Sequence, residues 1–410
     1  HRGAFVQELA SPAWVGKALS SGGRCIRFRP VPSSPPRVGA FRDYQQMTMQ
    51  QTISAVGFAK ETAAPRLRAA IADDKAMLRA ARDLTKDLAE AKPSIYWPDM
   101  VGSALVGYAA LAGAIVFANP VLVALCAIVA VLALYRALMF IHDLTHIHRD
   151  ALPGFRTGWN LLVGIPLLTP SFMYEGVHTL HHKRTQYGTV EDPEYLPLAL
   201  MKPWSLPLFV IIALLAPAAL MLRFAVLVPL GALFPSVRRL VWERASSLSI
   251  NPAFRRRPPE GEIKPRVMWQ EISGMVWAWA LLASTQWLGW RPLLIALAIK
   301  SAVAVLNQLR TLVAHLWENE GEAMSVTAQF LDSVNVPPPG RIAEVWAPVG
   351  LRYHALHHLM PSMPYHSLPE AHRRLVAALE LDSHYHSANH PGMLVLVGRL
   401  ARNTMGRRNV

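Results

Sequence analysis

The chain is poor in cysteine and in charged residues. Cys25 and Cys126 are its only cysteines and lie far apart, so we expect neither a disulfide framework nor a thiolate metal site. Charged residues make up 17% of the sequence and hydrophobic residues 52%, and the mean hydropathy of +0.23 is high for a soluble protein. These scarcities argue against a disulfide-stabilised secreted domain and indicate a membrane protein.

Acidic residues are the scarcest charged class. The 27 Asp and Glu face 41 Lys and Arg, which gives a formal net charge of +14. In a soluble protein this excess would suggest a nucleic-acid partner. In a membrane protein it supplies the cytoplasmic Lys and Arg excess and an attraction to anionic lipid, so we expect a bilayer partner and no nucleic acid.

Histidine, in contrast, is concentrated in three short clusters. Val177–Lys183 reads V-H-T-L-H-H-K and Arg352–Leu359 reads R-Y-H-A-L-H-H-L, so the pattern H-x-x-H-H occurs twice. With 16 histidines in 410 residues, chance would produce this pattern only ~0.02 times. A third cluster, Ile141–His146, reads I-H-D-L-T-H. The histidines of the three clusters are His142, His146, His178, His181, His182, His354, His357 and His358.

The spacing within these clusters predicts metal binding. Residues three and four positions apart share one face of a helix, so the histidines of a cluster can point at one centre. Neutral imidazole suits zinc, copper, iron and nickel, and the clusters contain no sulfur ligand. Eight imidazoles are too many for one first-row metal ion, so we expect two ions, bridged or adjacent.

The N-terminal residues 1–46 differ from the rest of the chain because they are rich in Arg, Pro, Ser and Gly. Such a composition buries too little apolar surface to order itself, which indicates a disordered extension or an Arg-rich targeting segment. Alternatively, translation begins at Met47 or Met49 and the preceding residues are upstream sequence that has been read through. We favour the second interpretation.

The remainder divides into three parts by composition. Residues 47–96 contain a charged, Ala-rich pattern that predicts an amphipathic cytoplasmic or interfacial helical segment. Residues 97–380 form the expected membrane domain, and residues 381–410 form a basic tail.

Within the membrane domain, four apolar runs are long enough to cross a bilayer and form two helical hairpins. They are residues 100–118, 121–141, 273–290 and 292–312. A further apolar run, 204–233, is interrupted by three prolines and an arginine. Because metal ligands must meet on one face, an even number of crossings separates the second and third clusters. We therefore expect this run to dip into the membrane and return.

The distribution of charge sets the expected orientation. The basic residues of the loops lie on the side of the histidine clusters, so the positive-inside rule places the clusters and both termini in the cytoplasm. The fold predicted is an all-α integral membrane protein, with four transmembrane helices in two hairpins and a cytoplasmic helical cap that holds the histidines. We expect it in a bacterial inner membrane. The basic residues on the side of the clusters are Arg149, Arg156, Lys183, Arg184, Arg238, Arg239, Arg244, Arg255, Arg256, Arg257, Lys264 and Arg266.

Polar residues gather near the end of the last apolar run. His315 follows that run directly and is a candidate ninth ligand. An intramembrane polar residue is by default a functional hypothesis, although Arg310 could equally snorkel to lipid headgroups, and Lys300 has no assigned role. Metal-bound histidine usually donates its second ring nitrogen to an acceptor, so carboxylates near the clusters are candidate supports. The candidates are Asp143, Glu191, Asp192 and Glu194, with Asn307 near the helix end.

The motifs H-D-L-T-H, H-T-L-H-H and H-A-L-H-H, with the spans between them, resemble the membrane fatty acid desaturase superfamily, in particular the bacterial acyl-lipid and acyl-CoA desaturases. The tails Y-G-T-V-E-D-P-E-Y and L-M-P-S-M-P-Y-H resemble it too, and the resemblance covers about residues 93–377. It implies two irons at the cytoplasmic face. Their ligands would be His142, His146, His178, His181, His182, His315, His354, His357 and His358.

The resemblance also implies the activity. Such enzymes use dioxygen and two electrons to remove two hydrogens from an acyl chain, which here would be carried by a lipid, coenzyme A or acyl carrier protein. An unactivated methylene has no acidic proton, so a redox metal must do the chemistry while the protein positions the chain. No H-P-G-G haem motif is present, so electrons would come from a separate ferredoxin or cytochrome b5-like donor. Some relatives have an Asn that supports an iron-bound water where this chain has Thr311, so whether Thr311 supports the metal centre stays open.

Two alternatives remain. A hydroxylase or ketolase of the same superfamily, acting on a fatty acid, an alkane or a carotenoid, begins with the same hydrogen abstraction, and the clusters alone do not separate the reactions. A metal transporter would place its ligands near the bilayer midplane. Here they flank the spans instead.

Overall fold

The computed structural model describes residues 70–340 and 342–406, all of which lie in the compact unit 60–410. The predicted extension 1–46 and the first part of the 47–96 segment lie outside these residues. The described residues are helical and contain only isolated bridges in place of strands, so the all-α prediction is confirmed.

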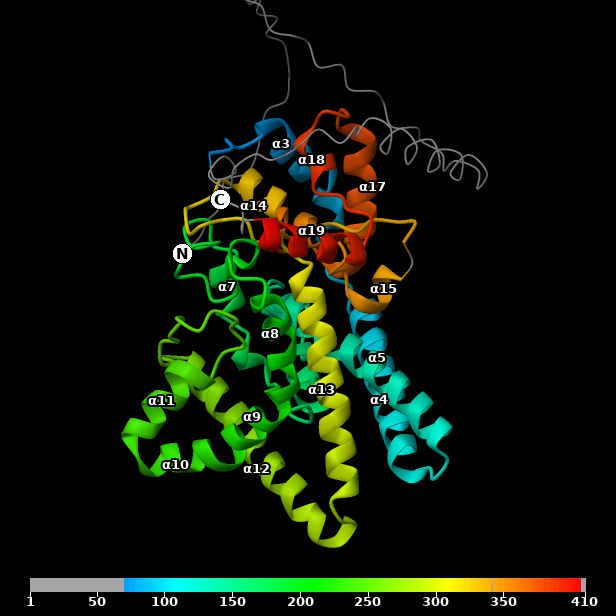
Figure 1. Ribbon diagram of the computed structural model, residues 1–410, viewed down its shortest axis with the longest axis vertical. Coiled ribbons are helices and arrows are strands. Elements are labelled where there is room, and N and C mark those ends of the chain that lie inside the picture. Colours follow the sequence, from blue (N-terminus) through cyan, green and yellow to red (C-terminus); the bar gives the residue numbers. More distant parts are fainter. Residues whose placement is uncertain (1–69, 341, 407–410) are drawn as a thin grey trace, which may run out of the picture. The chain divides into compact units, whose positions relative to one another are not determined.

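The longest helices form the lower part of Figure 1. They are α4 (Pro93–Val116), α5 (Pro120–Leu144), α12 (Ile263–Leu288) and α13 (Arg291–Leu312). Asn119 caps α5 by accepting from the backbone N–H groups of Val121 and Leu122, and Pro120 opens the helix. Gly107 of α4 lets the two helices approach closely, because a Cβ there would lie 2.6 Å from a Leu134 methyl carbon.

By length and composition, four helical stretches can cross a membrane: α4, α5, α13 and residues Ser205–Leu233. Four candidate spans were also predicted from the sequence, but one of the four is a different stretch of the chain. Residues 273–288 of the expected span 273–290 belong to α12, which is not among the four, since Trp, Ser, Thr and Gln residues lower its hydropathy.

The run Ser205–Leu233, which we expected only to dip into the membrane, is among the four candidates. It is a chain of short pieces: α8 (Ser205–Ile211), η6 (Ile212–Leu215), α9 (Ala216–Leu222), η7 (Arg223–Leu227) and α10 (Val228–Leu233). These short helices run in different directions, and α10 is nearly horizontal in Figure 1. A buried ion pair ties this run to α12, because Arg223 Nη2 lies 2.8 Å from Glu271 Oε1 and both side chains are 2% exposed.

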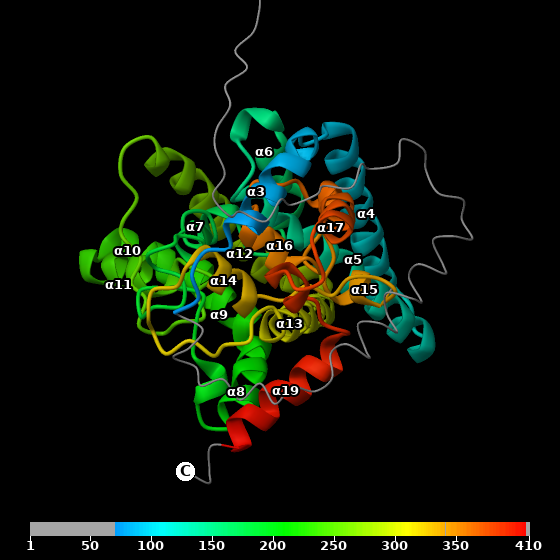
Figure 2. The ribbon, with the colours of Figure 1, turned by 90° about the horizontal axis from the view of Figure 1, so that it is seen from above.

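Short helices make up the end of the molecule that carries the histidines. In Figure 2, α16 lies near the middle of the view, with α7, α14 and α17 around it. The amphipathic helix α3 buries Met77 and Ala81 in the same hydrophobic cluster as residues of α16 and α17.

The described residues contain further short elements, of which α11 lies beside α10 in Figure 1. The short elements outside the run Ser205–Leu233 are α3 (Lys75–Leu84), η1 (Lys86–Leu88), η2 (Arg149–Ala151), α6 (Phe155–Trp159), η3 (Asn160–Gly164), η4 (Ser171–Met173), α7 (His178–His181), η5 (Leu198–Leu200), α11 (Pro235–Ala245), α14 (Val326–Asp332), α15 (Ala343–Trp346), α16 (His354–Leu359), η8 (Tyr365–Ser367), α17 (Leu368–Ala378), α18 (His384–Ser387) and α19 (Met393–Gly406).

Isolated backbone bridges fix the loop after α13. His315 pairs with Ser333, and Asn335 pairs with Tyr353, the residue before α16. The Asn335 side chain also accepts from the Leu356 backbone N–H at 3.0 Å. These contacts hold the end of a long apolar helix against the third histidine cluster.

Candidate metal centre

Each histidine cluster lies on a short stretch of helix or directly at a helix end. His142 is in the last turn of α5, and His146 follows in the turn after it. His178 and His181 belong to the single turn of α7, which His182 ends. The third cluster is carried by α16, and His315 follows α13. The three-and-four spacing therefore places the rings of each cluster on one side, as expected from helix geometry.

All nine predicted histidines come together, in two groups. Within each group the candidate ligand nitrogens all lie within 4.8 Å of one another. The first group takes members from all three clusters, whereas the second combines His315 with members of the second and third. The first group is His142, His146, His178, His182 and His357, and the second is His181, His315, His354 and His358.

The ring nitrogens in each group lie close enough to one another to bind a common cation. In the first group, His182 Nε2 lies 3.1 Å from His178 Nε2 and 3.0 Å from His357 Nε2. In the second, His354 Nε2 lies 3.0 Å from His315 Nε2 and 3.2 Å from His358 Nε2. A neutral imidazole nitrogen either donates or accepts, so one proton cannot satisfy three converging nitrogens. A metal ion in each group satisfies all of them, and the donor set suits iron or another first-row metal.

Unpaired nitrogens support the same interpretation. In the part of the chain that the structure describes, both ring nitrogens of His142 and Nε2 of His146 are buried and have no hydrogen-bond partner. Buried polar atoms are normally hydrogen-bonded, so exceptions of this kind point to an absent ligand or ion.

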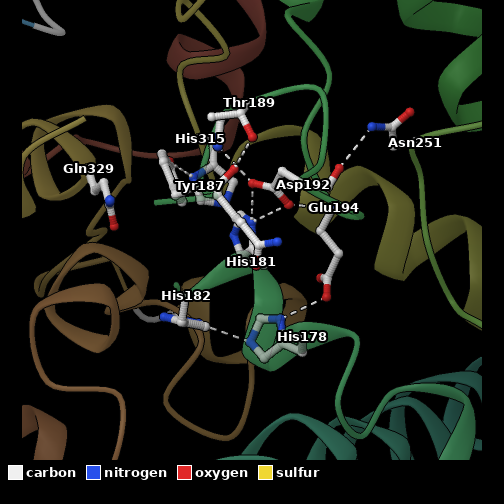
Figure 3. Close-up of polar contacts among 12 residues, drawn as sticks. His178, His181, His182, Tyr187, Thr189, Asp192, Glu194, Asn251, His315 and Gln329 are labelled. Atoms are coloured by element: carbon white, nitrogen blue, oxygen red, sulfur yellow. Dashed lines mark hydrogen bonds and ion pairs between the residues drawn. The ribbon is translucent and has the colours of Figure 1, made fainter. Parts of the chain in front are cut away.

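Carboxylates orient two of the histidines from behind, as Figure 3 shows. His178 Nδ1 lies 2.9 Å from Glu194 Oε1, and His181 Nδ1 lies 2.9 Å from Asp192 Oδ2. Each carboxylate accepts the Nδ1 proton, which leaves the Nε2 lone pair for a metal. Asp192 is fully buried and also accepts from the Gly188 backbone N–H at 2.8 Å.

His315 has a support that the sequence did not predict. Its Nδ1 donates to the Tyr187 hydroxyl at 2.9 Å, and that hydroxyl donates to Asp332 Oδ2 at 2.8 Å. Ser333 Oγ lies 3.2 Å from the same nitrogen. Tyr187 belongs to the tail of the second cluster, but Asp332 lies far along the chain with no local pattern to mark it.

The remaining predicted supports have other contacts. The carboxylate of Asp143 accepts from the Tyr96 hydroxyl at 2.6 Å, while its nearest approach to the His142 ring is 3.9 Å. Asn307 accepts from Arg310 at 3.2 Å. Thr311 is partly exposed on the last turn of α13, and Glu191 is exposed in the loop after α7.

Burial keeps most of these imidazoles neutral. It lowers the pKa of His146 to about 3 and holds those of His178, His182, His357 and His358 well below the usual value. Burial would also lower the pKa of His181, but the Asp192 carboxylate outweighs it and raises that pKa. Neutral rings are the form that binds metal.

Two comparisons with known proteins found similar sequences. The family model for fatty acid desaturase matches residues 118–390. A ceramide hydroxylase of Caulobacter vibrioides (strain NA1000 / CB15N) is 49% identical over 334 residues, which cover 81% of this chain and 95% of that protein. No solved structure matches the chain.

Proposed function

Because the chain belongs to the fatty acid desaturase family, we propose that it is a membrane-bound, di-iron, oxygen-dependent hydroxylase that acts on the acyl chain of a ceramide-type lipid. The observation that carries the proposal is the 49% identity with a ceramide hydroxylase along nearly the whole length of that protein. It favours the hydroxylase alternative over the desaturase that the sequence motifs suggested first. Substrates carried by coenzyme A or acyl carrier protein become less favoured for the same reason.

The two reactions differ in their atom balance. Hydroxylation converts R–H, one dioxygen, two electrons and two protons into R–OH and one water. Desaturation consumes the same reactants but removes two hydrogens from the chain and forms two waters. When bound, a pair of iron ions supplies the redox chemistry for either reaction. A ferredoxin or a cytochrome b5-like protein is the expected electron donor.

The chain's own residues would hold and orient that centre. The nine histidines supply neutral nitrogens from both groups, with five in one and four in the other. Glu194 and Asp192 would fix the tautomers of His178 and His181 by accepting their Nδ1 protons. Burial raises the pKa of Glu194 to about 7, and a bound cation would oppose that shift and favour the carboxylate.

The apolar helices beside the centre would receive the acyl chain. The ends of α5 and α13 bring His142 and His315 to the boundary between the long helices and the histidine-bearing cap. A lipid that lies in the bilayer can thus present a chain carbon to the centre without leaving the membrane. We further propose that the centre faces the cytoplasm of a bacterial cell, because the basic loops lie on that side.

Lipid mass spectrometry of a ceramide-producing host that expresses the chain tests the proposal. Hydroxylation adds sixteen mass units to a lipid, whereas desaturation removes two. The variant His181→Ala serves as the inactive control, because it removes a ligand of the second group. Loss of two mass units would support the desaturase alternative, and an unchanged lipid profile in the presence of a working electron donor would contradict both.

A further inference from the structure

Arg310 is a buried cation that forms no ion pair with any residue that the structure describes. It lies in the last turn of α13, and its side chain is 7% exposed, so it does not reach lipid headgroups. Its Nη2 donates to Asn307 Oδ1 at 3.2 Å, and it also interacts with the Tyr135 hydroxyl. Its Nε is buried and has no hydrogen-bond partner within residues 70–340 and 342–406.

Two other buried arginines each form an ion pair with a carboxylate. Arg223 forms an ion pair with Glu271 at 2.8 Å, and Arg352 forms one with Glu344 at 2.7 Å. Among the residues that the structure describes, no carboxylate lies within ion-pair distance of Arg310. A buried charge with an unused donor is unfavourable unless something else satisfies it.

Arg310 also lies beside the metal centre. Together with the ligand His354 it lines a small pocket that is otherwise mostly apolar and includes Val313, Trp346 and Leu351. Burial and a neighbouring imidazole lower the pKa values of His315 and His354, and the Arg310 charge adds to both shifts. A second, metal-borne positive charge at this place would make an unpaired guanidinium still less favourable.

We propose that Arg310 binds the acyl carbonyl oxygen of the substrate and so holds the carbon next to that carbonyl at the metal centre. The inference rests on the proposed function and specifies where the chain is oxidised. A guanidinium suits a carbonyl or carboxylate oxygen because it offers several donors in a fixed plane. If the reaction took place in the middle of a hydrocarbon chain, only methylene groups would lie beside Arg310, and its free donor would stay unpaired.

Direct binding to purified, metal-free protein tests the contact independently of catalysis. The probes are a short-chain ceramide, the fatty acid of its acyl chain and a hydrocarbon of similar length. The substitution Arg310→Met should weaken binding of the ceramide, the fatty acid or both by about 10- to 100-fold, since hydrogen bonds to charged groups are the stronger kind, and should leave hydrocarbon binding unchanged. Which carbonyl ligand loses more affinity identifies the source of the carbonyl.

Two further variants keep the test interpretable. Arg291→Gln alters the arginine at the opposite end of α13, which is exposed and donates to the Phe117 carbonyl, and should bind all probes as the wild type does. Arg310→Lys keeps the charge without the planar fork and should bind more tightly than Arg310→Met. If Arg310→Met does not purify as a folded protein, Arg310→Gln takes its place.

The position of the product gives a second readout. Fragmentation of the hydroxylated lipid should place the new hydroxyl on the carbon next to the acyl carbonyl. A hydroxyl in the middle of the chain, or carbonyl-ligand affinity that Arg310→Met leaves unchanged, would overturn the assignment. A wild-type protein that desaturates would refute the proposed function, while the binding experiment would still decide the role of Arg310.

Discussion

The substitution Asp192→Asn tests how the metal centre is supported. Asp192 is fully buried, and its two oxygens lie 2.9 and 3.0 Å from His181 Nδ1. One oxygen also accepts from the Gly188 backbone N–H and the other from that of Glu194, both at 2.8 Å. Asparagine has the same shape but only one acceptor oxygen. One of the two backbone donors must therefore face an amide N–H group.

Two effects follow from this change. A buried donor left without an acceptor costs about 1–3 kcal/mol of folding stability. His181 also loses an ionised partner for its Nδ1 proton, which makes it a poorer ligand, and changes behind a metal ligand lower metal affinity by about 10- to 100-fold. Because His181 belongs to the four-histidine group, only one of two bound ions should be weakened.

Iron titration in the presence of a competing chelator measures this loss. The matched control is Glu191→Gln, one residue away, because Glu191 is exposed and accepts from Gln186 rather than from a histidine. We expect the control to bind two irons as the wild type does. If Asp192→Asn kept both irons with affinities within about twofold of the wild type, the orienting role of the carboxylate would be refuted.

Three other substitutions probe the centre and its scaffold. Tyr187→Phe removes the hydroxyl that accepts from His315, so iron affinity in the four-histidine group should fall by about 10-fold, and unchanged chelator competition would contradict this. Glu271→Gln leaves the buried Arg223 without its counter-ion, so thermal unfolding in detergent should show a loss of about 3–5 kcal/mol, most of which replacement of both residues by Met should return. Burial lowers the pKa of His372 to about 4, below its unfolded value, so stability that is present above about pH 6.5 is lost as the pH falls towards 4. Relative to His372→Gln, the wild type should lose about 2 kcal/mol more between pH 7 and 5, and parallel pH profiles of the two proteins would argue against the assignment.

The convergence of the histidines was predictable because their spacing is local. Helix geometry places residues three and four positions apart on one face, so a few residues of each cluster are enough to predict that its histidines converge. The division of the nine histidines into groups of five and four depends on tertiary structure, and no local sequence pattern indicates it. The same holds for Asp332, which is linked to His315 through the hydroxyl of Tyr187, a residue of the loop after α7.

The number of candidate membrane spans was predictable from the sequence, but which stretches they are was not. Because prolines interrupt the run 204–233, we expected it to dip into the membrane and return. In the structure, Pro217 and Pro229 each stand in the first turn of a new short helix, where a missing backbone N–H costs little. The burial of Arg310 was not predictable either, because its position in the sequence fits both a side chain that snorkels to lipid headgroups and a buried one. Only the packing around the end of α13 decides between them.

The chain order of the ligands has a consequence for biogenesis. The first group needs His142, the earliest ligand, together with His357, and the second needs His358, so neither set is complete until the last cluster has been synthesised. Under the proposed function, a metal ion that needs a complete group can therefore bind only after the last cluster has been synthesised, when α4, α5, α12 and α13 have all been made. Termination between His315 and this cluster would release a polypeptide that carries six of the nine histidines yet completes neither group.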